Sequence, residues 1–257
     1  MSHDVLDACG DLLRNSRHPL VFTGAGMSAE SGLPTFRDSD NSLWARWPPE
    51  TLASAEGFRD DKALVWGWYA WRMANIAKST PNAGHLALAE LEDLRAELAV
   101  ITQNVDDLHE RAGTRRIVHL HGSIFQSRCF ACARPFVGYE IPDGAIEDPS
   151  LRIMPPKCRH CGGYVRPGVV WFGEALPVTA WSQSEQWVRE CDLLLVIGTS
   201  GVVQPAASLV SMARRRGVTI ILIDPGQSEH VASVDHHLRM GAGTALPALL
   251  ERVKSAR

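Results

Sequence analysis

Four cysteines form two pairs whose spacing suits a metal ion. Cys129 and Cys132 make one Cys-x-x-Cys pair, and after 25 intervening residues Cys158 and Cys161 make a second. Four thiolates from two such pairs suit tetrahedral Zn²⁺ and leave no ligand position open for water. Two redox-active dithiols are the alternative, but neither pair lies at a strand–helix junction, where thioredoxin-like motifs occur. The quartet therefore predicts one structural zinc ion.

A glycine-rich loop could bind the phosphates of a dinucleotide. Residues 24–29 read Gly-Ala-Gly-Met-Ser-Ala, directly after an apolar segment. In such a loop glycine lets backbone N–H groups approach a pyrophosphate, although similar turns also simply join a strand to a helix. A dehydrogenase has an acidic strand end about 20 residues later, but here residues 44–50 are rich in Trp and Pro. Hydride transfer is therefore disfavoured, although a dinucleotide can still bind.

Two further apolar segments end in polar residues that could do chemistry. Residues 98–101 lead into Thr102 to Asp106, and residues 117–120 lead into His121. Side chains at the carboxyl ends of parallel strands gather at one edge of a sheet, where ligands bind. Histidine titrates near neutral pH and can act there as a general base, although an isolated histidine is more often a surface or core residue.

These segments need a scaffold of alternating strands and helices. Apolar spacing predicts strands at residues 19–23, 98–101, 117–120, 169–172, 193–197 and 218–223. It predicts helices at residues 4–16, 60–78, 83–96, 178–190, 204–216 and 245–253. Such alternation favours an α/β fold with a parallel sheet covered by helices on both faces. Residues 39–56 read as irregular, and residues 123–167, which have no long periodic segment, read as a small inserted module.

Composition and charge limit the classes of partner. The chain has 257 residues, of which 45% are hydrophobic and 21% charged, so it can form a sizeable core. A net charge of -3 gives no excess of cations for nucleic acid. The start of the chain lacks a signal-peptide pattern, and no apolar run is long enough to cross a bilayer. We therefore expect a cytoplasmic protein without nucleic-acid or membrane partners, and we favour a monomer.

Two smaller observations refine these expectations. A zinc-ribbon module for nucleic acid would need a basic face, but the cysteine spacer carries Glu140, Asp143, Glu147 and Asp148. Cys9 and Cys191 stand apart from the quartet and are expected to be small buried apolar side chains.

In this order, the motifs resemble those of the sirtuin family over residues 4–253. The residues that carry the resemblance are Gly24–Ser28, Pro34–Arg37, Thr102–Asp106, His121–Gly122, the cysteine quartet, Phe172–Glu174 and Gly198–Ser200. The resemblance implies a Rossmann-like large domain formed by residues 1–38, 84–122 and 167–257. A small domain would comprise two insertions, a helical module at residues 39–83 and a zinc ribbon at residues 123–166.

The resemblance also implies an NAD-consuming protein-lysine deacylase. The acyl oxygen would attack the nicotinamide ribose, nicotinamide would leave, and the acyl group would end on ADP-ribose. His121 would be the catalytic base on a ribose hydroxyl, and NAD would be the co-substrate. By motif, the NAD-binding residues would be Gly24, Ala25, Gly26, Ser28, Thr35, Phe36, Arg37, Gln103, Asn104, Val105, Asp106, Gly198, Thr199, Ser200, Asp224 and Ala242.

The family pattern gives these residues separate roles. Residues 24–26 would hold the pyrophosphate, and the loop with residues 36–37 would close over the cofactor. Gln103 and Asn104 would contact the nicotinamide ribose, and Asp106 would contact the carboxamide, whose N–H groups a carboxylate accepts.

Two positions depart from the family pattern. Asp224 stands where sirtuins commonly have the asparagine that contacts the adenosine ribose; a carboxylate can accept both ribose hydroxyls, so NAD binding should persist. His119 stands where the family often has an acidic residue. Ala242 lies in a glycine-rich segment that resembles the adenine-contacting loop.

The acylated peptide would bind as an added strand, paired through its main chain, which tolerates many sequences. Tyr69 and Arg72 are three residues apart on one predicted helix face, and a phenol beside a guanidinium can bind a carboxylate. The same Tyr-x-x-Arg occurs in the sirtuin branch, with bacterial members, that removes succinyl, malonyl and glutaryl groups. On an arbitrary helix the tyrosine would pack and the arginine would face solvent, but the match in register favours removal of acidic acyl groups alongside acetyl. The residues implied for the substrate are Tyr69, Arg72, Val170, Phe172, Gly173, Glu174 and Val203.

Three alternatives stay open. The chain could be a sirtuin that removes only acetyl groups, or an ADP-ribosyltransferase of the same family. An NAD-linked dehydrogenase is a distant alternative, because it leaves the cysteine quartet and residues 103–106 unexplained.

Overall fold

The structure, a computed structural model, describes residues 3–34, 48–141, 148, 150–226 and 228–255. Contacts between residues divide the chain into two compact units. Unit 1 comprises Met1–Gly32, Pro81–Leu120 and Pro177–Arg257, and unit 2 comprises Leu33–Thr80 and His121–Leu176. Each unit is therefore built from segments that are discontinuous in the sequence.

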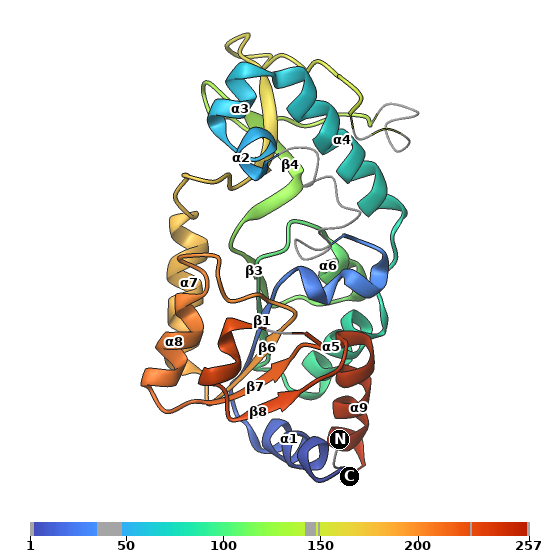
Figure 1. Cartoon of the computed structure of the whole chain (residues 1–257), viewed down its shortest axis with the longest axis vertical. Coiled ribbons are helices and arrows are strands. Elements are labelled where there is room, and N and C mark those ends of the chain that lie inside the picture. Colours follow the sequence, from blue (N-terminus) through green and yellow to red (C-terminus); the bar gives the residue numbers. More distant parts are fainter. Residues whose placement is uncertain (1–2, 35–47, 142–147, 149, 227, 256–257) are drawn as a thin grey trace. The chain divides into compact units, whose positions relative to one another are not determined.

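Within the described residues, unit 1 contains a six-stranded parallel sheet with helices on both faces (Figure 1). The strand order is β3-β2-β1-β6-β7-β8, which confirms the predicted Rossmann-like α/β fold. The strands are β1 (Pro19–Thr23), β2 (Ala99–Thr102), β3 (Ile117–His119), β6 (Leu193–Ile197), β7 (Thr219–Ile223) and β8 (His236–Leu238). The helices are α1 (His3–Asn15), α5 (Ala83–Leu94), α6 (Leu108–Ala112), α7 (Val178–Glu190), α8 (Ser208–Arg215) and α9 (Ala242–Lys254), with 3-10 turns η1 (Ala25–Met27), η2 (Ala29–Ser31) and η4 (Glu229–Ser233).

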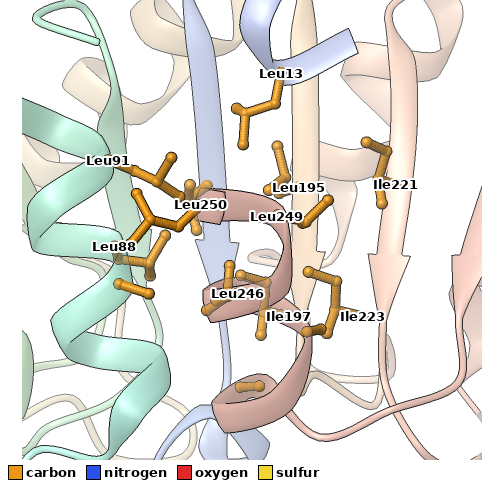
Figure 2. Packing of buried hydrophobic residues seen from close by; sticks show 14 of the residues in the cluster. Leu13, Leu88, Leu91, Leu195, Ile197, Ile221, Ile223, Leu246, Leu249 and Leu250 are labelled. Atoms are coloured by element: carbon orange, nitrogen blue, oxygen red, sulfur yellow. The ribbon is translucent and has the colours of Figure 1, made fainter. Parts of the chain in front are cut away.

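The main core lies between the sheet and the layer formed by α1, α5 and α9. Figure 2 shows leucines of α9, among them Leu246 and Leu249, packed over Leu195 of β6 and Ile221 of β7. Because side chains alternate along a strand, the intervening residues of β6 and β7 face the other layer, where α8 packs. Both faces are buried, which explains why these strands are continuous runs of Leu, Ile and Val.

Among its described residues, unit 2 combines an antiparallel strand pair with three helices. The pair is β4 (Gly122–Cys129) and β5 (Val165–Val169), and the helices are α2 (Pro49–Leu52), α3 (Ala55–Asp60) and α4 (Lys62–Lys78). The chain at Leu151 to Ile153 crosses α4 closely, and the N–H of Ile153 donates to the carbonyl oxygen of Ala63 over 3.0 Å. A Cβ atom on Gly67 would lie only 1.7 Å from the carbonyl oxygen of Leu151, so this crossing requires glycine in the middle of α4.

Three predicted elements differ from the structure. The strand expected at residues 169–172 is wrong, because β5 spans Val165–Val169 and Trp171 already belongs to a turn closed by Glu174. The helix expected from residue 204 begins only at Ser208, because residues 204–207 form turns, in which the N–H of Ser208 donates to the carbonyl oxygen of Pro205 over 2.9 Å. The module at residues 123–167 contains β4, whose polar and apolar residues do not show a clear period.

Some short elements were not predicted. They are α2, α3, α6 and β8, which have few apolar residues or lie at the edge of the sheet. Since α2 and the first residues of α3 fall within residues 39–56, the irregular segment predicted there is wrong from residue 49 onward. Among the described residues, no helix has the length and apolar character needed to cross a bilayer.

Candidate functional site

The four cysteines of the two pairs converge on one point in unit 2. Their Sγ atoms all lie within 4.8 Å of one another, with 3.5 Å between Cys129 and Cys161 and 3.8 Å between Cys132 and Cys158. In an ideal tetrahedron, four sulfurs about 2.3 Å from one Zn²⁺ lie about 3.8 Å apart. All four are free thiols, and the cluster fits the predicted structural zinc.

Backbone amides around the sulfurs favour their ionised form. The N–H of Cys132 points at the Sγ atom of Cys129 over 3.5 Å, and the N–H of His160 at that of Cys158 over 3.4 Å. Donation by the N–H groups of Cys161 and His160 lowers the pKa of Cys158 to about 7. A thiolate is the form that binds zinc, so the backbone around Cys158 favours the form of this ligand that the metal needs.

The two remaining cysteines behave as predicted. Cys9 and Cys191 are buried, and burial raises the pKa of each thiol to about 11. They are apolar packing residues of unit 1, not ligands.

The loops that follow β1 and β6 touch through their backbones. The N–H of Gly24 donates to the carbonyl oxygen of Ile197 over 3.0 Å, and the N–H of Gly26 donates to that of Gly198 over 2.8 Å. A Cβ on Gly26 would lie 2.6 Å from the Cα of Gly198, and Gly198 itself has a φ of 59°. The glycines are therefore required for this close approach. Ala25 lies half-buried between them, and the chain continues in the 3-10 turns η1 and η2.

Polar side chains after β1 and β2 form a buried network. The side-chain amide of Asn104 donates to Ser28 Oγ over 3.1 Å, and Ser28 Oγ donates to Asp106 Oδ2 over 3.1 Å. The other carboxylate oxygen accepts the N–H of Leu108 over 3.2 Å. Burial raises the pKa of Asp106, while the donors from Leu108 and Ser28 act in the opposite direction. The structure thus brings together three of the residues predicted to bind NAD.

A second contact joins the loops after β2 and β6. Gln103 Nε2 donates to Thr199 Oγ1 over 2.9 Å, and Val105 lies half-buried in the same loop as Gln103. The carbonyl oxygen of Ser200 accepts the N–H of Glu229 over 2.9 Å, which holds the loop after β6 against η4.

The residues predicted to bind the adenosine end of NAD follow β7 and begin α9. Asp224 is 2% exposed and accepts the N–H of Gly226 over 2.8 Å. Ala242, which is 4% exposed, is the first residue of α9. Since β1, β2, β6 and β7 run parallel, the residues that follow them share the carboxyl edge of the sheet. Carboxylates at that edge, with a buried Asn–Ser–Asp network, suit the hydroxyl and amide groups of a dinucleotide. Thr35, Phe36 and Arg37 lie outside the described residues.

His121 and the segment at residues 170–174 lie together in unit 2. The carbonyl oxygen of His121 accepts the N–H of Val170 over 2.8 Å, and the His121 side chain is half-buried. Phe172 is 50% exposed and Gly173 has a φ of 83°, so the turn presents an accessible surface. Val203, the other residue predicted for peptide binding, is half-buried in unit 1 before α8.

Glu174 is held by residues that sequence reasoning missed. Both of its carboxylate oxygens accept from the guanidinium of Arg166, and one also accepts the N–H of Trp171 over 2.9 Å. Arg166 is 3% exposed and its guanidinium carbon lies 3.4 Å from the centre of a Trp171 ring. Glu174 therefore stabilises the turn. An arginine in a strand between apolar residues is a signal for such a partner, because a buried guanidinium needs a carboxylate.

Tyr69 and Arg72 are neighbours on α4, as their spacing predicts. The guanidinium carbon of Arg72 lies 5.7 Å from the ring centre of Tyr69 and 4.9 Å from that of Trp68. Tyr69 is 1% exposed, and its phenolic oxygen accepts the indole N–H of Trp171 over 3.0 Å. Burial raises the pKa of Tyr69, opposed by Arg72 and by the Trp171 hydrogen bond. The phenol is thus both a packed side chain and a neutral neighbour of the guanidinium.

Comparison with known proteins gives one consistent assignment. The model of the Sir2 family matches residues 24–205. A Methylococcus capsulatus protein named NAD-dependent protein deacylase is 47% identical over 247 residues, which cover 95% of this chain and 96% of the relative. The solved complex of a Sir2 homolog with NAD has a TM-score of 0.88 and 43% identity, and covers 100% of this chain and 95% of its own. Sir2Af2 bound to a myristoylated histone peptide has a TM-score of 0.80 and 34% identity, covering 100% and 99%. The chain belongs to the Sir2 family, the sirtuins.

Proposed function

We propose that this chain is an NAD-dependent protein-lysine deacylase. It takes an acyl-lysine, NAD and water, and gives nicotinamide, O-acyl-ADP-ribose and free lysine. The Methylococcus capsulatus relative carries the name of this activity, and a homolog that is 43% identical binds NAD. These likenesses extend over at least 95% of both chains, so they support the same activity for the whole of this chain.

The observation that carries the proposal is the buried network of Ser28, Asn104 and Asp106 in unit 1. Bound NAD would supply a ribose carbon whose bond to nicotinamide can break. Asp106 would accept the carboxamide N–H groups and Asn104 would orient the nicotinamide ribose. Asp224 would accept the adenosine ribose hydroxyls, and the loops with Gly24 and Gly198 would border the pyrophosphate. A dinucleotide has a carboxamide and a ribose at one end for Asp106 and Asn104, and a second ribose at the other end for Asp224. A simple phosphate ligand lacks these groups.

Unit 2 would supply the proton chemistry and the peptide contact. His121 would take a proton from a ribose hydroxyl as general base. The accessible turn with Val170, Phe172 and Gly173 would pair with the substrate main chain. We propose Val203 of unit 1 as a further contact of the acylated peptide. The myristoylated histone peptide bound to Sir2Af2 supports an acylated peptide as substrate. The zinc ion, held by four thiolates, would have a structural role.

We further propose that acidic acyl groups such as succinyl and malonyl are preferred over acetyl. The support is the neighbouring pair of Tyr69 and Arg72 on α4. Arg72 would bind the distal carboxylate through paired N–H donors, and Tyr69 would donate its hydroxyl proton. An acetyl group ends in a methyl and leaves the guanidinium without this partner.

The test is turnover of matched succinyl-, malonyl- and acetyl-lysine peptides with NAD, followed by mass spectrometry. Arg72→Met should lower kcat/KM for the acidic peptides by about 100-fold, because a charge-assisted pair is lost, and should change the acetyl value by less than about threefold. Lys78→Met, which removes an exposed cation from the same helix, is the matched control and should behave as wild type. His121→Tyr should abolish removal of every acyl group.

The outcomes separate the alternatives. Removal of acetyl alone would contradict the acidic preference while the deacylase proposal stands. Transfer of label from radioactive NAD to the protein, without O-acyl-ADP-ribose, would indicate an ADP-ribosyltransferase. If acylated peptides never cause release of nicotinamide, the proposed function is wrong.

A further inference from the structure

His119, which departs from the family pattern, makes two specific contacts in unit 1. It is the last residue of β3, and its Nδ1 atom lies 2.9 Å from the carbonyl oxygen of Asn104. Its Nε2 atom lies 2.7 Å from a carboxylate oxygen of Glu110 on α6. Carbonyl and carboxylate oxygens only accept hydrogen bonds, so both ring nitrogens must carry protons to satisfy both partners. The geometry therefore calls for an imidazolium cation.

The surroundings of His119 stabilise this cation. Burial of the imidazole lowers its pKa, but the hydrogen bond and charge of Glu110, the Asn104 carbonyl and the Asp106 charge together outweigh burial. The net result is a raised pKa for His119, and the pKa of Glu110 is lowered in return. His109, on the same helix as Glu110, is buried with a pKa well below its ordinary value, and so adds no competing charge at neutral pH.

The contact with His119 adds to the hydrogen bonds that fix Asn104. The backbone N–H of Asn104 donates to Thr102 Oγ1 over 3.0 Å, and its side-chain amide donates to Ser28 Oγ over 3.1 Å. The backbone carbonyl oxygen is a third polar group of Asn104 that a neighbour holds, since it lies 2.9 Å from Nδ1 of His119. The same cation is among the groups that lower the pKa of Asp106 against the effect of burial. One side chain thus influences both the orientation of Asn104 and the charge of Asp106.

We propose that His119, paired with Glu110, is a positioning residue for the nicotinamide end of NAD. It sets the orientation of Asn104 through the Asn104 carbonyl and helps to keep Asp106 ionised, without touching the cofactor itself. The inference rests on the proposed function, because that function gives Asn104 and Asp106 their ligand. The competing explanation is that His119 only ties β3 to α6.

The experiment compares binding of NAD and ADP by isothermal titration calorimetry with the full chain. ADP carries the adenosine and pyrophosphate of NAD but lacks the nicotinamide riboside. His119→Gln can place an amide near the Nε2 position but offers no donor at the Nδ1 position. We expect NAD to bind about tenfold more weakly to this variant and ADP to bind within about twofold of wild type.

His119→Asn is the conservative variant, because its amide nitrogen lies as far along the side chain as Nδ1. It should recover NAD binding to within about threefold of wild type. His18→Gln is the matched control. His18 is an exposed histidine just before β1, at the amino end of the strand, whereas the residues predicted to bind NAD follow the carboxyl ends; its replacement should leave binding of both ligands unchanged. Glu110→Gln provides a second variant with nearly unchanged shape, and should weaken NAD binding by about threefold while ADP binding is kept.

Two results would overturn the proposal. One is equal binding of NAD by wild type, His119→Gln and Glu110→Gln. The other is an equal loss of NAD and ADP together with a lower unfolding temperature, which is the signature of a merely structural tie. If the selective loss of NAD binding is found but wild type releases no nicotinamide with acylated peptides, the deacylase proposal fails while the role of His119 stands.

Discussion

The indole N–H of Trp171 donates to the phenolic oxygen of Tyr69 over 3.0 Å, and both side chains are buried in unit 2. Trp171 is itself fixed, since its ring packs 5.5 Å from that of Phe58 and under the guanidinium of Arg166. Because the phenolic oxygen accepts this bond, its own proton stays available for donation. Trp171 therefore orients the hydroxyl that we propose to bind the carboxylate of an acidic acyl group.

Trp171→Phe should reduce the preference for acidic acyl groups. The substitution keeps an aromatic ring but removes the donor, so the Tyr69 hydroxyl can rotate away from its orientation. We expect KM for a succinyl peptide to rise by about fivefold, the effect of one neutral hydrogen bond, with little change for an acetyl peptide. Steady-state kinetics with both peptides measure this. Tyr69→Phe should give a similar rise, and the double variant should add little to either single change; fully additive effects would show that the two residues act independently.

Replacing one cysteine of the quartet should remove the zinc. Cys132→Ala leaves three thiolates for a site that needs four, so we expect the metal content to fall from one ion per chain to nearly none. The unfolding temperature should fall by about 10 °C, because metal binding contributes to folding. Cys191→Ala is the control, since Cys191 is a buried apolar filler outside the cluster. Loss of zinc from this control would contradict the assignment of the ligands.

Gly67→Ala should destabilise the protein although alanine is the better helix former. In an ordinary helix the change stabilises by about 1 kcal/mol, but here the new Cβ would lie 1.7 Å from the carbonyl oxygen of Leu151. Moving that backbone should cost about 2–4 kcal/mol, seen as a lower midpoint of urea unfolding. Ala74→Gly, at a half-buried position of the same helix, should cost only about 1 kcal/mol. A stabilised Gly67→Ala protein would contradict the crossing at Leu151.

The free energy of unfolding should decrease as the pH is lowered below about 6.5, because two histidines are buried in the folded protein. The rings of His85 and His109 lie 4.9 Å apart, and burial lowers the pKa of His85 to about 4 and that of His109 well below its ordinary value. Above the unfolded pKa both states are neutral and nothing is lost. As the pH falls, the unfolded state takes up protons that the folded state refuses, so His85 alone should remove about 2 kcal/mol between pH 7 and pH 5.

Urea unfolding at both pH values measures this effect. His85→Gln carries no titrating group, so its stability should depend on pH less steeply by about that amount. An unchanged slope would mean that His85 is protonated in the folded protein.

Strong local patterns explain what the sequence could predict of the fold. The run from Leu193 to Ile197 is apolar, lies between Asp192 and Gly198, and is a strand with those bounds. Likewise α7 begins and ends where its spacing indicates. By contrast, β8 contains two histidines at the edge of the sheet, and only pairing with β7 makes it a strand. The bounds of β5 depend on its pairing with β4, which no local pattern reveals.

In the candidate site too, some residues follow from local sequence patterns, whereas others depend on contacts between distant parts of the chain. The zinc cluster follows from cysteine spacing, since each pair is a local structure and the metal has one preferred geometry. The positions of Gly24 and Asn104 follow from strand ends. The partner of Glu174 does not, because Arg166 becomes its partner only through the turn at residues 170–174. Nor could spacing show that His119 would hold the Asn104 carbonyl, since this depends on the parallel register of β2 and β3.

The core in Figure 2 has a consequence for the order in which unit 1 is completed during synthesis. The leucines of α9 cover one face of β1, β6 and β7 and also pack on α1 and α5, yet α9 follows all of these elements in the chain. Until α9 leaves the ribosome, that face of the sheet is only partly covered by helices. The contacts between α1 and α9 join segments that are far apart in the sequence, so they can form only after α9 has been synthesised. The nascent chain therefore exposes the apolar residues of β1, β6 and β7 until α9 has been synthesised, and this is the stage at which a chaperone would be needed.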